Sequence, residues 1–205
     1  MLSQDTSDME KFVRFCDSDF GRRVVGLEAE YIYGELKDCR RVLDVGCGIG
    51  SFESRLQQLS IVGLDRSKDM LNEAKKRSGA EYVLGDAENL CFKALSFDAV
   101  MYITILEFIP DYEKSIQEAF QVLQPKGRLL IMLLNPISRY FKQHINRENS
   151  YFRKVKHTEL PQIENYVSNF FVVRTEYFLG IDGEDVFDSH SAEKSSLYVI
   201  KGERK

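Results

Sequence analysis

The stretch Val42-Leu43-Asp44-Val45-Gly46-Cys47-Gly48-Ile49-Gly50 decides the fold. Its first four residues are apolar apart from Asp44 and include two valines, a pattern typical of a buried strand. Glycine then occupies every second position, where the missing Cβ permits positive φ angles and lets the backbone approach a ligand closely. A helix is expected from about Ser51, so its free N–H groups would face the turn and favour a carboxylate or phosphate there.

Short apolar runs alternate with amphipathic segments along the rest of the chain. Strands are predicted at residues 41–45, 60–64, 81–84, 97–102 and 127–134, followed by Phe170–Phe178 and Leu197–Lys201. Ser67 and Asp111 are suited to cap the helices between them. This β-α-β order predicts an α/β fold, a Rossmann-like three-layer α-β-α sandwich. Its mostly parallel, seven-stranded sheet would end with an antiparallel C-terminal strand.

The length of 205 residues predicts a single domain, within which we expect four regions. These are a helical cap at 1–38, a cofactor-binding core at 39–135, an insertion covering the acceptor at 136–157, and a C-terminal helix and strands at 158–205. The insertion is assigned to the acceptor because such segments sit above the carboxyl edge of a parallel sheet.

Composition and charge argue against several classes of function. The net charge of −4 lacks the basic stripe that binds phosphate backbones, so a nucleic-acid partner is disfavoured and a small molecule is expected. The four cysteines form no C-x-x-C pair, so no metal site is predicted. The longest apolar run, Leu129–Leu134, is far shorter than the roughly 20 residues needed to cross a bilayer. Without a signal-peptide pattern, we expect a cytoplasmic monomer or homodimer.

Acidic residues follow the second and third predicted strands. Asp65 ends the second strand, about twenty residues beyond the glycine-rich turn, where a carboxylate can accept both hydroxyl hydrogens of a ribose. Asp86 follows the third strand and could accept a hydrogen bond from an adenine amino group. Because ligands of open α/β sheets bind at the carboxyl ends of strands, these positions together predict an adenosine-containing ligand.

The glycine pattern distinguishes between two adenosine cofactors. Dinucleotide-binding proteins carry G-x-G-x-x-G, whereas this chain has Ser51 at the third glycine position. Asp44 would repel a pyrophosphate but could hold the ammonium group of an amino acid. The pattern therefore favours S-adenosylmethionine over NAD. A NAD-dependent oxidoreductase and a non-catalytic adenosine-binding regulatory module remain as alternatives.

Five ordered segments resemble the motifs of class I S-adenosylmethionine-dependent methyltransferases. They are Val42–Gly50, Gly63–Ser67, Gly85–Ala87, Phe97–Val100 and Val122–Gly127. The resemblance covers about residues 38–135 and is closest to the small-molecule subgroup of the ubiquinone and menaquinone biosynthetic type. It implies S-adenosylmethionine as the cofactor, with S-adenosylhomocysteine as the product, and a methyl acceptor that the sequence does not identify.

The resemblance also implies roles for individual residues. The cofactor-binding set is Asp44, Gly46, Cys47, Gly48, Gly50, Asp65, Arg66, Asp86, Ala87, Tyr102 and Ile103. Asp44 and the glycines would hold the methionine portion of the cofactor, and Asp65 would hold its ribose. Arg66 would lie along the adenine, whose edge Asp86 and Ala87 would recognise. Tyr102 or Ile103 would face the sulfonium.

The chain departs from the family pattern in two places. The common L-x-P-G-G turn carries Lys126 in place of its first glycine, and Glu107 stands where relatives often have histidine. A general base could contribute roughly 10²- to 10⁴-fold to a transfer that removes a proton. Location alone makes four residues candidates, and none is assigned as catalytic: Glu107, Tyr140, His144 and His157.

Two weaker signals concern the cover over the site. Phe20-Gly21-Arg22 resembles an amino-terminal lid segment of some family members, although a surface helix start explains it equally well. Arg139, Arg147 and Arg153 indicate either an acidic acceptor or a solvated helix face.

Overall fold

The protein is described from a computed structural model that covers residues 2–148 and 150–205, with side chains from Met9 onward. Met1 and Asn149, which fall in the predicted helical cap and insertion, lie outside the described residues.

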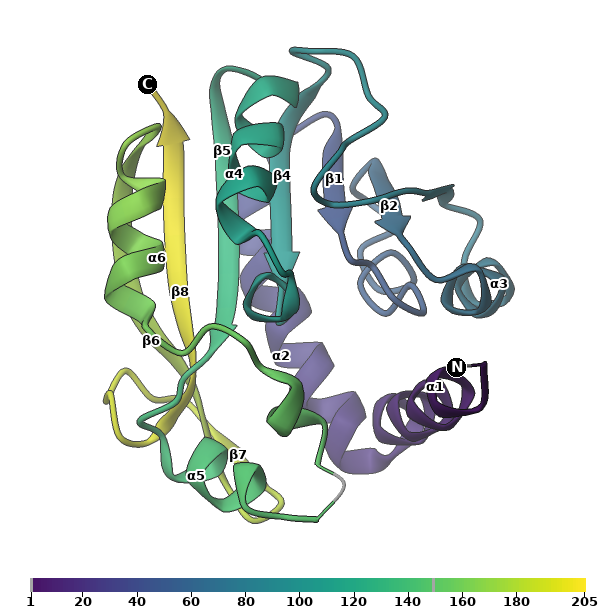
Figure 1. The fold of residues 1–205 in the computed structure, drawn as a ribbon, viewed down its shortest axis with the longest axis vertical. Coiled ribbons are helices and arrows are strands. Elements are labelled where there is room, and N and C mark those ends of the chain that lie inside the picture. Colours follow the sequence, from purple (N-terminus) through teal and green to yellow (C-terminus); the bar gives the residue numbers. More distant parts are fainter. Residues whose placement is uncertain (1, 149) are drawn as a thin grey trace.

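One twisted sheet runs through the described chain (Figure 1), with the strand order β3-β2-β1-β4-β5-β8-β6-β7. The strands are β1 (Val42–Val45), β2 (Ile61–Asp65), β3 (Glu81–Leu84), β4 (Phe97–Ile103), β5 (Leu123–Leu134), β6 (Phe171–Asp182), β7 (Asp185–Phe187) and β8 (Ser195–Arg204). β1 to β5 are mutually parallel, and β8 lies antiparallel between β5 and β6. The predicted α/β fold class is confirmed.

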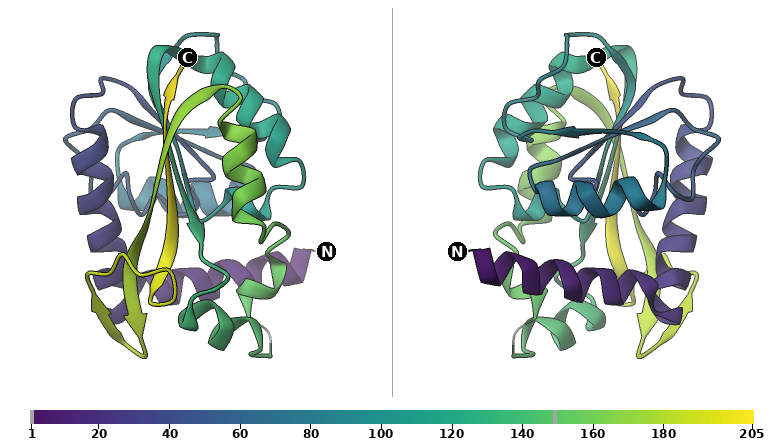
Figure 2. Two further views of the ribbon diagram at one scale, coloured as in Figure 1. Left: turned by 90° about the vertical axis from the view of Figure 1, so that its left-hand side faces the viewer. Right: turned by 90° about the vertical axis from the view of Figure 1, so that its right-hand side faces the viewer.

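Helices cover both faces of this sheet (Figure 2) and complete three layers. They are α1 (Leu2–Asp17), α2 (Asp19–Leu36), α3 (Lys68–Arg77), α4 (Tyr112–Val122), α5 (Arg139–Ile145) and α6 (Leu160–Val167), with short 3₁₀ helices η1 (Leu106–Phe108) and η2 (Tyr151–Lys154). The apolar side chains of α4 and α6 pack on one face of the sheet, and those of α2 pack on the other. Ser67 and Asp111 cap α3 and α4 as predicted.

β5 illustrates why the central strands lack polar–apolar alternation. Leu129 and Ile131 point to the α4 and α6 face, whereas Leu130 and Met132 point to the α2 face. All four are essentially buried because helices cover both sides of a parallel sheet. A continuous apolar run is therefore the expected signature of this strand.

Two details differ from the sequence prediction. The segment after Gly50 forms consecutive turns instead of a helix: the N–H of Arg55 donates to the carbonyl of Phe52, and the carbonyl of Ser51 accepts from the side chains of Ser54 and Arg55 instead. The sheet also has one more strand than predicted, since β6 folds back into β7 through a tight turn at Gly183, whose φ is 61°.

The departure at Lys126 lies in an irregular part of β5. Phe97 pairs with Leu123 but Ala99 pairs with Arg128, so extra residues bulge out of β5. Lys126 sits in this bulge, is exposed, and adopts a φ of 62°. This left-handed conformation costs a non-glycine residue roughly 1–2 kcal/mol. The glycine common in relatives would avoid that cost.

Lys126→Gly is therefore expected to raise the free energy of unfolding by about 1 kcal/mol, measured by urea denaturation. Lys126→Ala is the matched control, because it removes the same charge but keeps a Cβ at positive φ. Equal stability of the glycine and alanine variants would contradict strain at this position.

Candidate active site

The glycine-rich turn leaves β1 at the carboxyl edge of the sheet. Gly46 and Gly48 adopt φ angles of 79° and 55°, and the N–H of Gly46 donates to the carbonyl of Leu64 at 2.7 Å. A Cβ on Gly46 would lie 2.4 Å from Cγ1 of Ile105, so glycine is required there by space as well as by conformation. The turn thus presents bare backbone to the region above β1.

Asp65, the last residue of β2, fixes this turn to the neighbouring strand. One carboxylate oxygen accepts the N–H of Gly48 at 2.9 Å, and the other accepts the N–H of Ser67 at 2.8 Å. Burial raises the pKa of Asp65, and these backbone hydrogen bonds partly oppose the shift. The side chain is half-buried and borders the same cavity as Asp44 and Gly48.

Asp44 faces a second buried acid, Glu53. Oδ2 of Asp44 and both oxygens of Glu53 receive no hydrogen bond from other groups of the described chain, and the two carboxyls lie close enough to share a proton. Burial, followed by the charge of Glu53, raises the pKa of Asp44 well above its ordinary value. Burial also raises the pKa of Glu53 to about 7. Of the two acids only Asp44 borders the cavity, so its carboxyl is the one that a cation in the cavity could approach.

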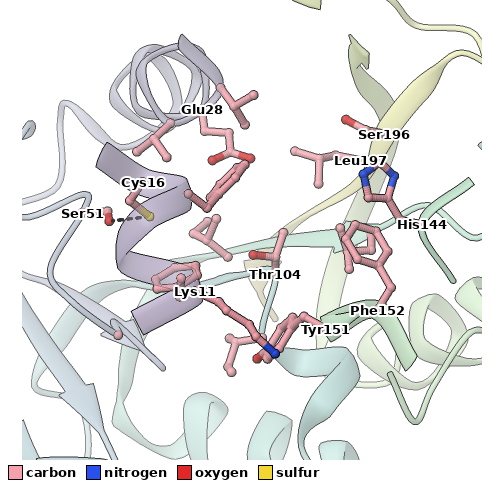
Figure 3. A pocket seen from close by; sticks show the side chains of 18 of the residues that line it. Lys11, Cys16, Glu28, Ser51, Thr104, His144, Tyr151, Phe152, Ser196 and Leu197 are labelled. Atoms are coloured by element: carbon pink, nitrogen blue, oxygen red, sulfur yellow. Dashed lines mark hydrogen bonds between the residues drawn. The ribbon is translucent and has the colours of Figure 1, made fainter. Parts of the chain in front are cut away.

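A cavity of about 720 Å³ opens beside these groups. Most of its wall is apolar, and its aromatic residues come from segments that lie far apart in the chain: Phe12, Phe15, Phe20, Phe52, Phe108, Tyr140, Tyr151 and Phe152. Figure 3 shows Glu28 on one side of the cavity and His144 and Leu197 on the other. The volume and the largely apolar wall are typical of a small-molecule site.

Six of the predicted cofactor-binding residues line this cavity: Asp44, Gly46, Cys47, Gly48, Asp65 and Ile103. Gly50, Arg66, Asp86 and Ala87 lie outside its lining. Asp86 is exposed after β3, where its Oδ1 accepts the N–H of Glu88 at 3.0 Å. The adenine contacts assigned to Arg66, Asp86 and Ala87 stay predictions.

Tyr102 requires a correction. It lies within β4, and its hydroxyl donates to the carbonyl of Ser115 on α4 at 2.9 Å. The side chain is fully buried and points to the sheet face covered by α4 and α6, because side chains alternate along a strand. Ile103, the next residue, points to the other face and borders the cavity. Of the two alternatives, only Ile103 has a side chain in position to meet a ligand there.

The four candidate bases separate into two groups. Glu107 does not line the cavity; it is buried, accepts the N–H of Leu134 at 2.9 Å, and has a pKa raised by burial to about 7. His157 also lies outside the lining, and its Nε2 is 2.9 Å from the carbonyl of Ile109. Tyr140 and His144 do border the cavity. Glu107 and His157 therefore hold neighbouring segments together in this structure.

His144 is held in a defined orientation. Its Nδ1 lies 2.8 Å from the carbonyl of Tyr140, and its Nε2 lies 3.1 Å from a guanidinium nitrogen of Arg147. Arginine can only donate, so Nε2 accepts and Nδ1–H donates to the carbonyl. Burial lowers the pKa of His144, which favours the same neutral form.

The cover of the cavity comes from α1, α2, α5 and η2. Gly21 is required at the corner between α1 and α2, since a Cβ there would lie 1.9 Å from the carbonyl oxygen of Phe15. Phe20 lines the cavity beside this corner, in the segment with the predicted lid resemblance. Tyr140 and Phe152 close it from the predicted insertion. Sequence spacing did not reveal most of these aromatic residues, because they lie far apart in the chain.

Known proteins of one class are similar to this chain over its parallel core. Residues 43–131 match the family model of a methyltransferase domain. The predicted resemblance to class I S-adenosylmethionine-dependent methyltransferases is confirmed by this match and by the named relatives. Residues 43–131 of this chain are therefore similar to a methyltransferase domain, and the fold around them is Rossmann-like.

Individual relatives are similar over part of their length. Demethylmenaquinone methyltransferase of Thermotoga maritima is 36% identical over 125 residues, which cover 58% of this chain and 52% of that protein. Phthiotriol/phenolphthiotriol dimycocerosates methyltransferase of Mycobacterium leprae is 32% identical over 128 residues, covering 59% and 47% respectively. The chain thus spans about half the length of these relatives.

Solved structures share the fold more completely. An S-adenosylmethionine-dependent methyltransferase from Thermotoga maritima, described as a possible histamine N-methyltransferase, has a TM-score of 0.81 at 22% identity. The likeness covers 96% of this chain and 95% of that chain. Because the identity is low, this likeness supports the fold alone. It extends over the antiparallel strands that follow the parallel core.

Asp65→Ala is expected to weaken S-adenosylhomocysteine binding by about tenfold or more, because hydrogen bonds to a charged acceptor are lost. Isothermal titration calorimetry measures the change. Asp69→Ala, at an exposed acid in the first turn of α3, is the matched control and should bind like wild type. Equal affinity of the Asp65 variant and wild type would contradict the ribose assignment.

The Asp44–Glu53 pair predicts a pH-dependent affinity for the same ligand. Asp44 must lose its proton to pair with an ammonium group, and its pKa is raised, so affinity should increase with pH by up to about tenfold per pH unit as the pH rises toward about 7, the pKa of the neighbouring Glu53. Titration in two buffers of different ionisation enthalpy should show proton release on binding. Glu53→Gln should flatten the dependence because the glutamine side chain carries no charge beside Asp44. A pH-independent affinity for wild type would contradict the shared proton.

Proposed function

We propose that this protein is an enzyme that transfers a methyl group from S-adenosylmethionine to a small-molecule acceptor. One observation carries the proposal: Asp44, the backbone of Gly46–Gly48 and Asp65 converge at the carboxyl ends of adjacent parallel strands and open into an aromatic cavity. The methyltransferase domain match over residues 43–131 supports the same activity.

The residues present fit this cofactor. Asp44 has an unpartnered buried oxygen where an ammonium group would be attracted. Asp65 offers a carboxylate to ribose hydroxyls, and the Gly46–Gly48 backbone leaves room for the chain between them. We assign the remaining cofactor contacts to Cys47, Gly50, Arg66, Asp86, Ala87 and Ile103, as the family resemblance implies.

The chemistry depends mainly on alignment. When bound, S-adenosylmethionine supplies a methyl carbon attached to a positively charged sulfur. Holding the acceptor in line with that bond can lower the activation barrier by roughly 7–11 kcal/mol, because the entropy of bringing the two reactants together is lost on binding and not in the reaction step. Aromatic side chains such as Phe20 and Phe152 would exclude water, and Ile103 would border the reacting carbon. No residue is assigned as a general base.

The two alternatives to a methyltransferase, an oxidoreductase and a regulatory module, fit the cavity less well. A NAD-dependent oxidoreductase would place a pyrophosphate beside Asp44 and Glu53, two buried acids that repel it. A regulatory module needs only a cofactor site, whereas here the cavity continues from Asp44 to Tyr140 and Phe152 and leaves space for an acceptor. The relatives are named as methyltransferases, which also favours catalysis.

The proposal also covers the partners and the cellular location of the protein. No helix in the described residues is long and apolar enough to span a membrane. No group of three or more potential ligands suited to a metal ion occurs in the described part of the chain. We propose a small-molecule acceptor, a cytoplasmic location and a monomer or homodimer.

Calorimetric titration tests the cofactor assignment. S-adenosylmethionine and S-adenosylhomocysteine are expected to bind in the micromolar range, whereas NADH should give no heat because Asp44 repels its pyrophosphate. Asp44→Asn serves as the matched variant and should weaken both sulfur compounds. Binding of NADH without the sulfur compounds would overturn the proposal and favour the oxidoreductase. Screening small acceptors for S-adenosylhomocysteine formation then separates an enzyme from a regulatory module.

A further inference from the structure

Glu28 lies on the buried face of α2, where the spacing of apolar residues along the helix predicts another apolar residue. Val24, Glu28 and Ile32 are spaced four residues apart, so they form one buried stripe along the helix. Glu28 is only 7% exposed, and it lines the cavity beside Val24 and Val25. Figure 3 shows its carboxyl group pointing into the cavity.

The carboxyl of Glu28 has no hydrogen-bond partner among the residues that the structure describes. Burial raises its pKa to about 8, and the one opposing influence is the positive charge of Arg55. Tyr140 and Cys16 also lie close enough to feel its charge. A buried carboxyl without a partner destabilises a fold, so a group delivered by a ligand is the natural partner.

The charges around the cavity favour a positive ligand group at this depth. Among the described residues that line it, the buried or half-buried acids are Asp44, Asp65 and Glu28. Asp44 and Asp65 belong to the cofactor side, which leaves Glu28 for the acceptor. The cations Lys11 and Arg147 also line the cavity, but both are exposed and remain hydrated.

The wall around Glu28 defines the remainder of the ligand. Phe15, Phe20 and Tyr140 line the same cavity with apolar surface, which would bury an aromatic or aliphatic body. Aromatic rings also attract a cation placed over their faces. The combination of one buried carboxyl and several rings suits an amine attached to an apolar group.

We propose that Glu28 binds the protonated amine of the methyl acceptor, so that the acceptor is a small amine with an aromatic or aliphatic body. This inference rests on the proposed function, because it takes the cavity beyond Asp44 to be the acceptor site. Glu28 is a substrate-binding and specificity-determining residue in this account. It is separate from the cofactor-binding set.

The test uses full-length protein saturated with S-adenosylhomocysteine and three probes of similar shape: 2-phenylethylamine, 2-phenylethanol and 3-phenylpropionate. Calorimetry should detect binding of the amine, with weaker or no binding of the alcohol and the carboxylate. Glu28→Gln should weaken amine binding by about 10- to 100-fold, since a charge-assisted hydrogen bond is lost. Glu30→Gln, at an exposed acid on the same helix, is the matched control and should bind the amine like wild type.

Thermal melting shows whether the variant is folded. The raised pKa means that the folded chain binds this proton more tightly, so the contribution of Glu28 to wild-type stability falls as pH rises from about 4.5 to about 8. Glu28→Gln lacks the ionisable group and should melt above wild type near pH 8, and like wild type near pH 4.

Four results would overturn the inference. They are equal amine affinity in Glu28→Gln and wild type, preference for the carboxylate probe, no amine binding to protein that binds S-adenosylhomocysteine, and weaker S-adenosylhomocysteine binding in Glu28→Gln. The last would make Glu28 a cofactor ligand. If wild-type protein does not bind S-adenosylhomocysteine, the result would instead contradict the proposed function itself.

Discussion

The pairing of β1 with β2 on one side and β4 on the other determines where the candidate site lies. Val42 aligns with Ile61 and with Ala99, so all three strands end at the same edge of the sheet. Backbone hydrogen bonds in a dry sheet interior hold this register, because unpaired groups there would be costly. The glycine-rich turn and Asp65 are consequently brought together, and their hydrogen bond joins the ends of β1 and β2.

Burial of carboxyl groups is the physical feature that recurs around the cavity. Asp44, Glu53, Asp65 and Glu28 all have raised pKa values, and desolvation is the largest cause for each. Buried acids that form no ion pair among the described residues reduce stability. Such an arrangement is suited to a cationic cofactor and, as proposed for Glu28, to a cationic acceptor. The buried carboxyl groups therefore lower the stability of the fold and favour the binding of cationic ligands.

The sequence was sufficient for the parallel core, since buried strands and helix caps leave strong local patterns. It was insufficient where contacts join distant segments. The sequence did not predict that Glu53 lies beside Asp44, because the turns after Gly50 bring these two residues together. Glu28 was predicted only as part of an amphipathic helix. The Tyr102 error arose because neighbouring strand residues face opposite sides of a sheet, so a shift of one position changes the assignment. β7 was too short to leave a recognisable pattern.

A crystal structure of the protein with S-adenosylhomocysteine would test the central claim most directly. The ribose hydroxyls are expected at Asp65, the amino-acid end beside Asp44 and Gly48, and the sulfur facing the aromatic cavity near Ile103. A ligand bound elsewhere, or with its ribose away from Asp65, would contradict the assignment of this sheet edge as the cofactor site.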